Sequence, residues 1–152
     1  MTAVRDHAGL RAKRAVGAVR RVVGASDPVT GPGDDGAVVE TGGGASIVVC
    51  GEAVHPAFVA SDPRAAGIAA VLANVNDLAA MGAAPRAIVN TVVAPAAVAV
   101  EALQGMAEAA VLYGVPIVGG HLVQRLTQLI RDELADARLQ AVVVRHVAAP
   151  VQ

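Results

Sequence analysis

Residues that could bind a phosphate or a metal ion are concentrated in one short stretch, Asn74–Pro85, with the sequence NVNDLAAMGAAP. On a helix, Asn74, Asp77 and Met81 share one face because they are spaced three and four residues apart. An unpaired carboxylate is costly to bury among apolar turns, so we expect Asp77 to meet a cation or several hydrogen-bond donors. The alternative is structural: a buried helix whose one carboxylate caps a neighbouring loop.

Three other segments place acids or glycines at the ends of apolar stretches: Gly33-Asp34-Asp35 before one, Glu52 after a second, and Gly119-Gly120-His121 after a third. Carboxylates from separate elements suit Mg²⁺, which takes oxygen ligands and fills its remaining sites with water and substrate phosphates. Glycines beside them let the backbone approach a phosphate closely. An acid pair at a strand entrance is also typical of an ordinary turn.

Hydrophobic spacing predicts the elements that must position these residues. Apolar residues at helical intervals with basic residues between them predict a first helix near residues 9–24, and Asp62-Pro63 is a typical helix start. The expected strands are 37–40, 46–50, 86–93 and 115–118, with a further possible strand at 141–147, and the other expected helices are 62–81, 96–113 and an amphipathic one at 122–139.

Composition limits the classes of protein to which the chain can belong. Its 152 residues are enough for one domain with its own core. With a net charge of −1 and 1% aromatic residues, the chain offers little to a nucleic acid. One cysteine, Cys50, excludes an internal disulfide and a cysteine-rich zinc site. No apolar run is long enough to span a membrane, so we expect a cytoplasmic protein without membrane or nucleic-acid partners.

Three motifs carry a resemblance to a known family: GDDGAVV from Gly33, NVNDLAAMGAAP from Asn74 and YGVPIVGGH from Tyr113. With these, residues 8–121 resemble the amino-terminal domain of the aminoimidazole ribonucleotide synthetase superfamily, which includes thiamine-monophosphate kinase and selenophosphate synthetase. The segment HPAFVASDP from His55 is most similar to an uncharacterised synthase-related branch.

The resemblance implies an α+β domain with a four-stranded sheet and helices on one face. It also implies a homodimer formed through two such sheets, with ATP and Mg²⁺ bound at its mouth. Carried over residue by residue, it implies metal-binding acids at Asp34, Asp35, Glu52 and Asp77, cofactor-binding residues at Gly33, Asn74, Asn76, Gly119 and Gly120, and catalytic residues at Lys13 and His121. We therefore expect Asp35 and Asp77 to lie within reach of one magnesium ion.

Some of these positions depart from the family pattern. Many relatives have an acid and a threonine where this chain has His121-Leu122, and an imidazole there would face phosphate rather than bind magnesium. Glu52 stands where relatives often have an aspartate. Lys13 belongs to a basic helix, whose ordinary role is a solvated face.

We expect residues 1–121 to form the ATP-binding domain and residues 122–152 to be a divergent tail in place of the family's second domain. The function predicted is ATP and magnesium binding for synthetase or kinase-like phosphoryl transfer to a small molecule, in a homodimer and with a separately encoded second domain as a further partner. The alternatives are a non-catalytic nucleotide-binding or dimerisation module and a truncated remnant. No motif names the phosphate acceptor.

Overall fold

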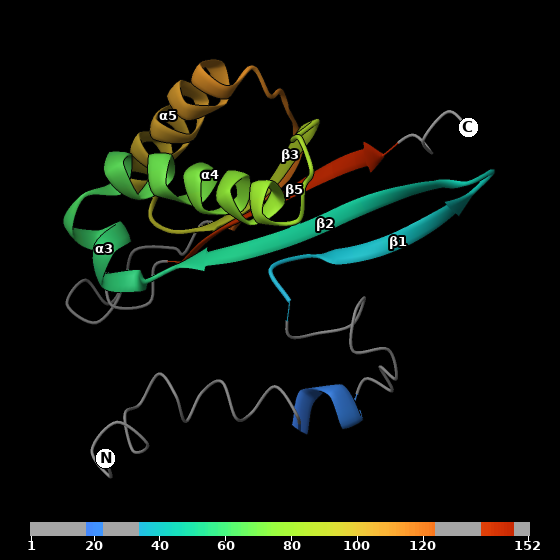
Figure 1. The fold of residues 1–152 in the computed structure, drawn as a ribbon. Helices are drawn as coiled ribbons and strands as arrows, with labels where there is room; N and C mark the ends of the chain where they lie inside the picture. Colours follow the sequence, from blue (N-terminus) through green and yellow to red (C-terminus); the bar gives the residue numbers. More distant parts are fainter. Residues whose placement is uncertain (1–17, 23–33, 124–137, 148–152) are drawn as a thin grey trace, which may run out of the picture.

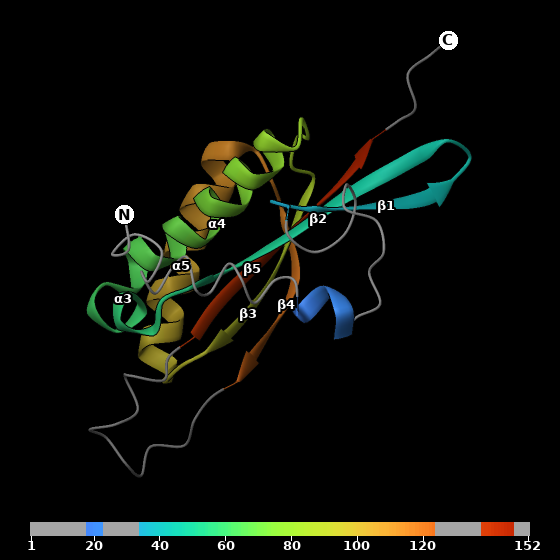
Figure 2. The ribbon, with the colours of Figure 1, turned by 60° about the horizontal axis from the view of Figure 1, so that its bottom comes forward.

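The computed structural model describes residues 18–22, 34–123 and 138–147. Residues 18–22 are helical. The remaining elements are, in chain order, β1 (Ala37–Gly42), β2 (Ala45–Val54), α3 (Pro56–Ser61), α4 (Pro63–Ala80), β3 (Ala87–Val93), α5 (Ala96–Tyr113), β4 (Ile117–Val123) and β5 (Arg138–Val147). The fold is mixed α/β, with α3, α4 and α5 on one face of the sheet (Figures 1 and 2).

The sheet has five strands in the order β1-β2-β5-β3-β4, so the expected count of four is corrected. β5 lies between β2 and β3 and pairs antiparallel with both, whereas β3 and β4 are parallel. The segment 141–147, which was a possible strand from its sequence, is therefore part of a longer strand inside the sheet. Its place there follows from pairing with two distant strands.

Local sequence signals determine where the hairpin and the helices begin and end. Glycines 42, 43 and 44 adopt positive φ values of 84°, 63° and 77° at the turn between β1 and β2, which residues with a side chain rarely tolerate. Asp62 caps α4 by accepting a hydrogen bond from the Ala65 amide at 2.9 Å, with Pro63 in the first turn. Gly114 ends α5 in the left-handed conformation.

The core lies between the sheet and the pair α4 and α5, and it is made of small and aliphatic residues. Its largest fully buried apolar side chains are Leu78, Ile88, Met106, Val59, Val71 and Val92. The two helices cross in backbone contact, because a Cβ at Gly67 would lie 2.0 Å from the Ala102 carbonyl oxygen and one at Gly105 would lie 2.0 Å from that of Arg64. Small residues therefore set the close approach of α4 and α5.

Within the described residues one helix, α5, is long and apolar enough to span a membrane by length and composition alone. A core helix of a globular domain meets the same criteria. Because the backbone of α5 is in contact with that of α4 at Gly105, we interpret α5 as a packed helix of this domain.

The domain boundary that we expect at residue 121 stays a prediction. Backbone pairing nevertheless continues across it, since β4 runs to Val123 and β5 lies in the middle of the sheet. The amphipathic helix expected at 122–139 falls mostly outside the described residues.

Candidate functional site

The entrance to β1 lies against β2 and the end of α4, and Gly36 is the residue next to both. Gly36 is buried, and a Cβ there would lie 2.9 Å from Cγ1 of Val48 and 3.4 Å from Cγ of Met81, the residue that ends α4. A side chain at this position would crowd Val48 of β2, whereas its Cβ would make only ordinary van der Waals contact with Met81. Asp35, the neighbour of Gly36 in sequence, thus lies near the last turn of α4, which contains Asp77.

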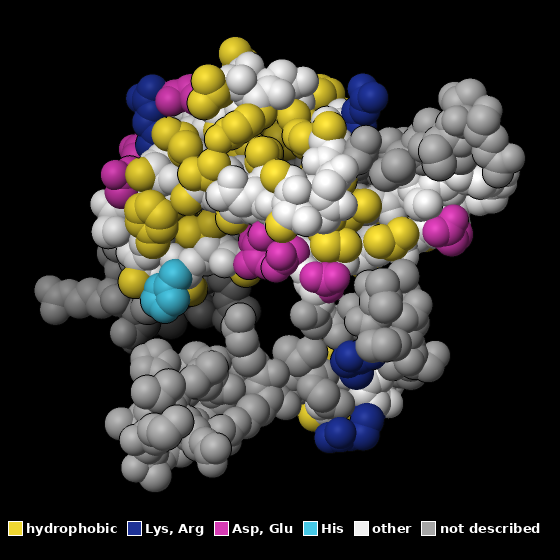
Figure 3. Space-filling model, viewed as in Figure 1, with side chains coloured by type: hydrophobic (Ala, Val, Ile, Leu, Met, Phe, Trp, Pro, Cys, Tyr) yellow, Lys and Arg dark blue, Asp and Glu magenta, His cyan; other side chains and the backbone are white. Residues whose placement is uncertain are grey.

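Asp77 and Asp35 interact electrostatically across this junction. Burial raises the pKa of Asp77 above its usual value of 3.8, and the negative charge of Asp35 raises it further. The Oδ2 atom of Asp77 is buried and has no hydrogen-bond partner among the described residues. In the space-filling view, acidic side chains gather between the end of α4 and the start of β1 (Figure 3).

The other two acids expected at a metal site lie near the same sheet end but complete no cluster. Asp34 is exposed and accepts a hydrogen bond from the amide of Asp35 at 3.0 Å. Glu52 is exposed and lies within β2, opposite Ala141 of β5, rather than in a loop after the strand. Among the described residues, no three side chains of His, Cys, Asp or Glu are grouped so that they could hold a metal ion.

Asn74 has a structural role in the core. It is fully buried, its Nδ2 donates to the Ala70 carbonyl oxygen at 2.8 Å, and its Oδ1 lies 3.4 Å from the Cys50 thiol, which donates to it. Asn74 therefore joins α4 to β2 one turn before Asp77. Asn76, two residues further along the helix, is exposed. Nucleotide contact by either residue stays a prediction.

Gly119, Gly120 and His121 lie within β4, which corrects their expected place in a loop after the strand. They form a strand because β4 continues in parallel register with β3, pairing Gly120 with Asn90 and His121 with Thr91. The same row of the sheet runs from Glu52 through Ala141 and Asn90 to Gly120. Glu52 and Gly120 are thus three strand spacings apart, about 14 Å.

Asn90 is a buried polar residue that the sequence reasoning did not select. It is 8% exposed on β3, and a Cβ at Gly120 would lie 2.4 Å from its Oδ1 atom. Its backbone carbonyl oxygen would lie 2.6 Å from the same Cβ, so both the side chain and the backbone of Asn90 leave room only for a glycine. Gly119 has no such constraint, since nothing lies within 4 Å of a Cβ placed there. A lone asparagine in the run AIVNTVV, opposite a glycine, was the available signal.

Lys13 and Gly33 lie outside the described residues, so their predicted roles stay predictions. What the described part provides is one buried carboxylate oxygen without a donor, beside a second carboxylate. Two negative charges in this position repel each other unless a proton or a cation lies between them. Mg²⁺ is commonly held by one or two protein carboxylates, so Asp35 and Asp77 fit a magnesium ion that is otherwise bound by water and phosphate.

Comparison with known proteins finds relatives both in sequence and in structure. In sequence, the chain is 39% identical over 114 residues to thiamine-monophosphate kinase of Mycobacterium tuberculosis, covering 68% of this chain and 34% of the kinase. In structure, it is similar to AaThiL, solved in complex with AMPPCP and TMP, with a TM-score of 0.67 and 20% identity over 87% of this chain and 40% of that one.

A second structural relative is PurL of Thermotoga maritima, solved in complex with AMPPCP. It is similar with a TM-score of 0.69 and 21% identity, over 88% of this chain and 24% of that one. The chain spans about a third of the length of the curated relatives that it matches. At these identities the solved structures establish the fold.

The family itself is established by a sequence model that covers two thirds of the chain. The model of the family described as AIR synthase related protein, N-terminal domain, matches residues 33–134. This range contains both the Asp35–Asp77 junction and the strand β4. The chain therefore belongs to the family of AIR synthase related proteins, of which it contains the N-terminal domain.

Proposed function

We propose that this domain binds ATP together with Mg²⁺, as part of a protein that transfers a phosphoryl group to a small molecule. The observation that carries the proposal is the Asp77 carboxylate, whose buried Oδ2 has no donor among the described residues and which faces the charge of Asp35. A bound cation would neutralise both acids. Its remaining sites would be filled by water and by the phosphates of the nucleotide.

The relatives support a nucleotide as the ligand. Two of the similar structures were solved with AMPPCP, an analogue of ATP, and one of these also holds TMP. Since the chain is similar in sequence to a thiamine-monophosphate kinase, we infer a kinase-like or synthetase-like reaction of the same general class. In such reactions the protein chiefly positions the phosphates and neutralises their charge.

Each of the candidate site residues would then have one role in binding the nucleotide or the metal ion. Asp35 and Asp77 would hold the magnesium ion, which supplies charge neutralisation at the phosphates, and Asp34 would fix the backbone of Asp35 through the hydrogen bond that it already accepts. Gly119 leaves open space on β4 in which a phosphate could approach the backbone. His121 is exposed and, when protonated, would face a phosphate as a cation.

We infer a homodimer as the assembly, because the face of the sheet opposite α4 and α5 carries exposed apolar side chains. Val39 on β1 is 45% exposed and Val89 on β3 is 40% exposed. A sheet covered by helices on one face alone is usually covered on the other by a further layer. A second copy related by a two-fold axis is the commonest such layer.

A second candidate is a nucleotide-binding or dimerisation module without turnover. It is favoured by the exposed apolar side chains of Val39 and Val89 on the open face of the sheet, which suit an interface. The two candidates share the same magnesium and nucleotide site. They differ in whether the chain alone converts bound ATP, which a phosphate-release assay at saturating nucleotide decides.

Calorimetric titration with AMPPCP, with and without Mg²⁺, tests the proposed site. We expect magnesium-dependent binding in the wild type, and its loss in both Asp77→Asn and Asp35→Asn, because each change removes a charge while retaining the shape. Glu108→Gln is the matched control: Glu108 pairs with Arg64 on the surface of the helices, away from the Asp35–Asp77 junction. Unchanged binding in the two aspartate variants would overturn the proposal.

A further inference from the structure

A buried polar contact joins β2 to α4 close to the acids of the proposed metal site. Cys50 of β2 is 5% exposed, and Asn74 of α4 is fully buried. The Cys50 thiol donates to Asn74, with Sγ 3.4 Å from its Oδ1 atom and 3.5 Å from its carbonyl oxygen. The Nδ2 atom of Asn74 in turn donates to the Ala70 carbonyl oxygen at 2.8 Å. Both polar atoms of the Asn74 side chain are therefore engaged.

The other buried residues of α4 carry no polar side chain. They are Ala66, Gly67, Ala70, Val71 and Leu78. Apolar packing is non-directional, so it holds α4 on the sheet without defining one rotation of the helix about its axis. A satisfied buried hydrogen bond specifies one arrangement. Asn74 is therefore the buried side chain of α4 that orients the helix on β2 by a directional contact.

The contact lies one helical turn before Asp77. Asn74 and Asp77 are three residues apart in α4 and therefore share one flank of the helix. The carbonyl oxygen of Asp77 accepts a hydrogen bond from the amide of Met81, at the end of the helix, at 3.0 Å. Asp77 thus lies between the Cys50–Asn74 contact and the helix end, and it moves with this part of α4 when the helix rotates.

The same stretch of β2 also lies beside the other acid. Val48 and Cys50 are both buried and two residues apart, so they share one face of the strand, about 7 Å apart. A Cβ at Gly36, the residue after Asp35, would lie 2.9 Å from Cγ1 of Val48. Asp35 is therefore held near Val48 and Asp77 near Cys50, so the separation of the acids depends on the rotation of α4 on this strand.

A magnesium ion would be sensitive to that rotation. Mg²⁺ requires near-ideal octahedral geometry with oxygen ligands at about 2.0–2.1 Å. A carboxylate about 6 Å from a helix axis moves by about 1 Å when the helix rotates by about 10°. A small rotation of α4 therefore separates Asp77 from an ion held by Asp35, even where the fold persists.

We propose that Cys50 and Asn74 are positioning residues for the metal ion: the thiol, by donating to Asn74, fixes the rotation of α4 on β2 and so holds Asp77 beside Asp35. The inference rests on the proposed function, because the position of Asp77 matters for the magnesium ion that it would hold. Neither residue needs to touch the ion or the nucleotide, since both act through Asp77.

A double-mutant cycle on the dissociation constant of Mg²⁺–AMPPCP, measured by calorimetry, tests this coupling. Cys50→Ala removes the donor and Asn74→Ala removes the acceptor, and each is expected to weaken binding at least about fivefold. The double variant should lose about as much as the weaker of the two single variants, rather than the product of both losses, because one contact is removed in each case. Cys50→Ser retains a donor and should bind within about twofold of the wild type.

Val59→Ala separates positioning from a general loss of stability. Val59 is fully buried in α3, which lies at the other end of α4 (Figure 1), and Asp77 is about 21 Å along the helix from Pro63. This variant leaves a cavity in the core. We expect it to lower the urea midpoint and to bind Mg²⁺–AMPPCP as tightly as the wild type.

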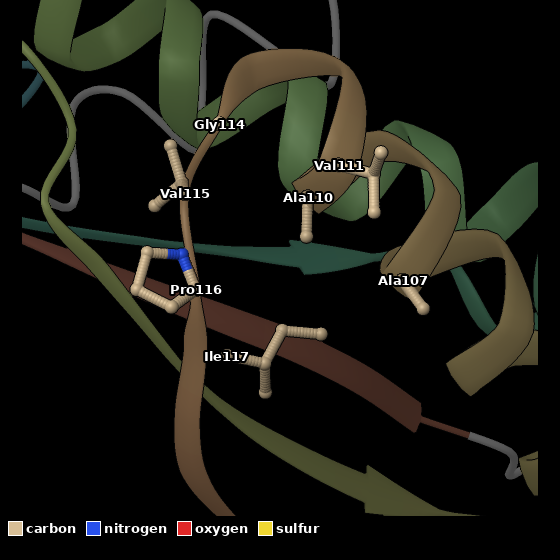
Figure 4. A pocket seen from close by; sticks show the side chains of 7 residues that line it. All are labelled: Ala107, Ala110, Val111, Gly114, Val115, Pro116 and Ile117. Carbon is tan, nitrogen blue, oxygen red and sulfur yellow. The ribbon is translucent and has the colours of Figure 1, made fainter.

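Binding elsewhere on the domain would not respond to the cycle. An apolar pocket of about 450 Å³ lies between the end of α5 and the start of β4. Figure 4 shows that its lining comes from α5 and from the segment 115–117. None of the lining residues has a polar side chain, so the pocket offers no side-chain ligand to magnesium. The loss expected in Cys50→Ala therefore reports on the Asp35–Asp77 junction.

Amide hydrogen exchange of the metal-free protein provides a second readout. Exchange from Asp77 to Met81 is expected to quicken at least about fivefold in Cys50→Ala and to stay as in the wild type in Cys50→Ser. If the wild type does not bind Mg²⁺–AMPPCP, the proposed function fails and this inference fails with it. If the wild type binds but Cys50→Ala binds equally well, or Val59→Ala binds as weakly as Cys50→Ala, the inference alone is overturned. Unchanged exchange in Cys50→Ala overturns it too, and so does additivity in the cycle. Should Asn74→Ala not fold, the Cys50→Ala and Cys50→Ser pair decides.

Discussion

Replacing Gly105 by alanine should destabilise the domain, although alanine is the better helix former. The added Cβ would lie 2.0 Å from the carbonyl oxygen of Arg64, and a Cβ contact below 3.0 Å is essentially never seen. The partner atoms belong to the backbone of α4, so no rotamer change relieves the contact. The two helices must therefore separate by about 1 Å or more, in a core that is otherwise close-packed.

The magnitude follows from two opposing effects. Overpacking a core costs about 1–3 kcal/mol, and more where the structure cannot relax, whereas alanine in place of glycine favours a helix by about 1 kcal/mol. Because the contact is backbone against backbone, we place the packing cost at the upper end. The expected net loss is about 2 kcal/mol, which lowers the melting temperature by about 4–8 °C.

Urea denaturation followed by circular dichroism at the helix band measures this difference. Gly119→Ala is the matched control, because the same methyl group meets no heavy atom within 4 Å on β4, and its stability should equal or slightly exceed that of the wild type. If Gly105→Ala is as stable as the wild type, then α4 and α5 do not cross in backbone contact, and the packing described above is wrong.

Three further predictions concern the buried polar residues. Asn74→Ala should cost about 1–3 kcal/mol in urea denaturation without nucleotide, because it removes the buried hydrogen bond to Ala70 and the contact of Oδ1 with the Cys50 thiol; an unchanged midpoint would contradict the structural role. Since the pKa of Asp77 is raised in the folded state above 3.8, its ionisation opposes folding, so stability should fall as pH rises through the window above that value. Asp77→Asn should remove this part of the pH dependence, and identical profiles would contradict it. Gly120→Ala should destabilise the domain relative to Gly119→Ala, because its methyl group meets both the side chain and the backbone carbonyl oxygen of Asn90; equal midpoints would contradict this close contact.

Local chemistry made the helix ends and the hairpin predictable. The cap at Asp62, the proline at 63 and the glycine at 114 act within a few residues of their position in the chain, so their effect can be inferred without a fold. The closeness of Asp35 and Asp77 was expected from the motifs that carry the family resemblance. The packing of Gly36 beside Val48 and Met81, next to which the two acids lie, is visible only in three dimensions.

The strands at the sheet centre and edge were harder to predict because their pairing is non-local. β5 is separated in the chain from β2 by more than eighty residues, and the segment that precedes it has a helical pattern. Glu52 and the Gly119–His121 segment were placed in loops because each follows an apolar run, yet both lie within strands that continue beside a partner. Asn90 was missed although the alternation of β3 places it on the same buried face as Ile88 and Val92.

The most direct test of the central claim is to locate the cation. Mn²⁺ in place of Mg²⁺, added with AMPPCP to isotopically labelled protein, broadens the amide resonances of nearby residues. We expect the signals of Asp35, Gly36 and Asp77 to disappear first, while those of Val111–Val115 persist, and Asp77→Asn to abolish the effect. Broadening centred on another part of the domain, or none at millimolar metal and nucleotide, would contradict the assignment of Asp35 and Asp77 as the magnesium site.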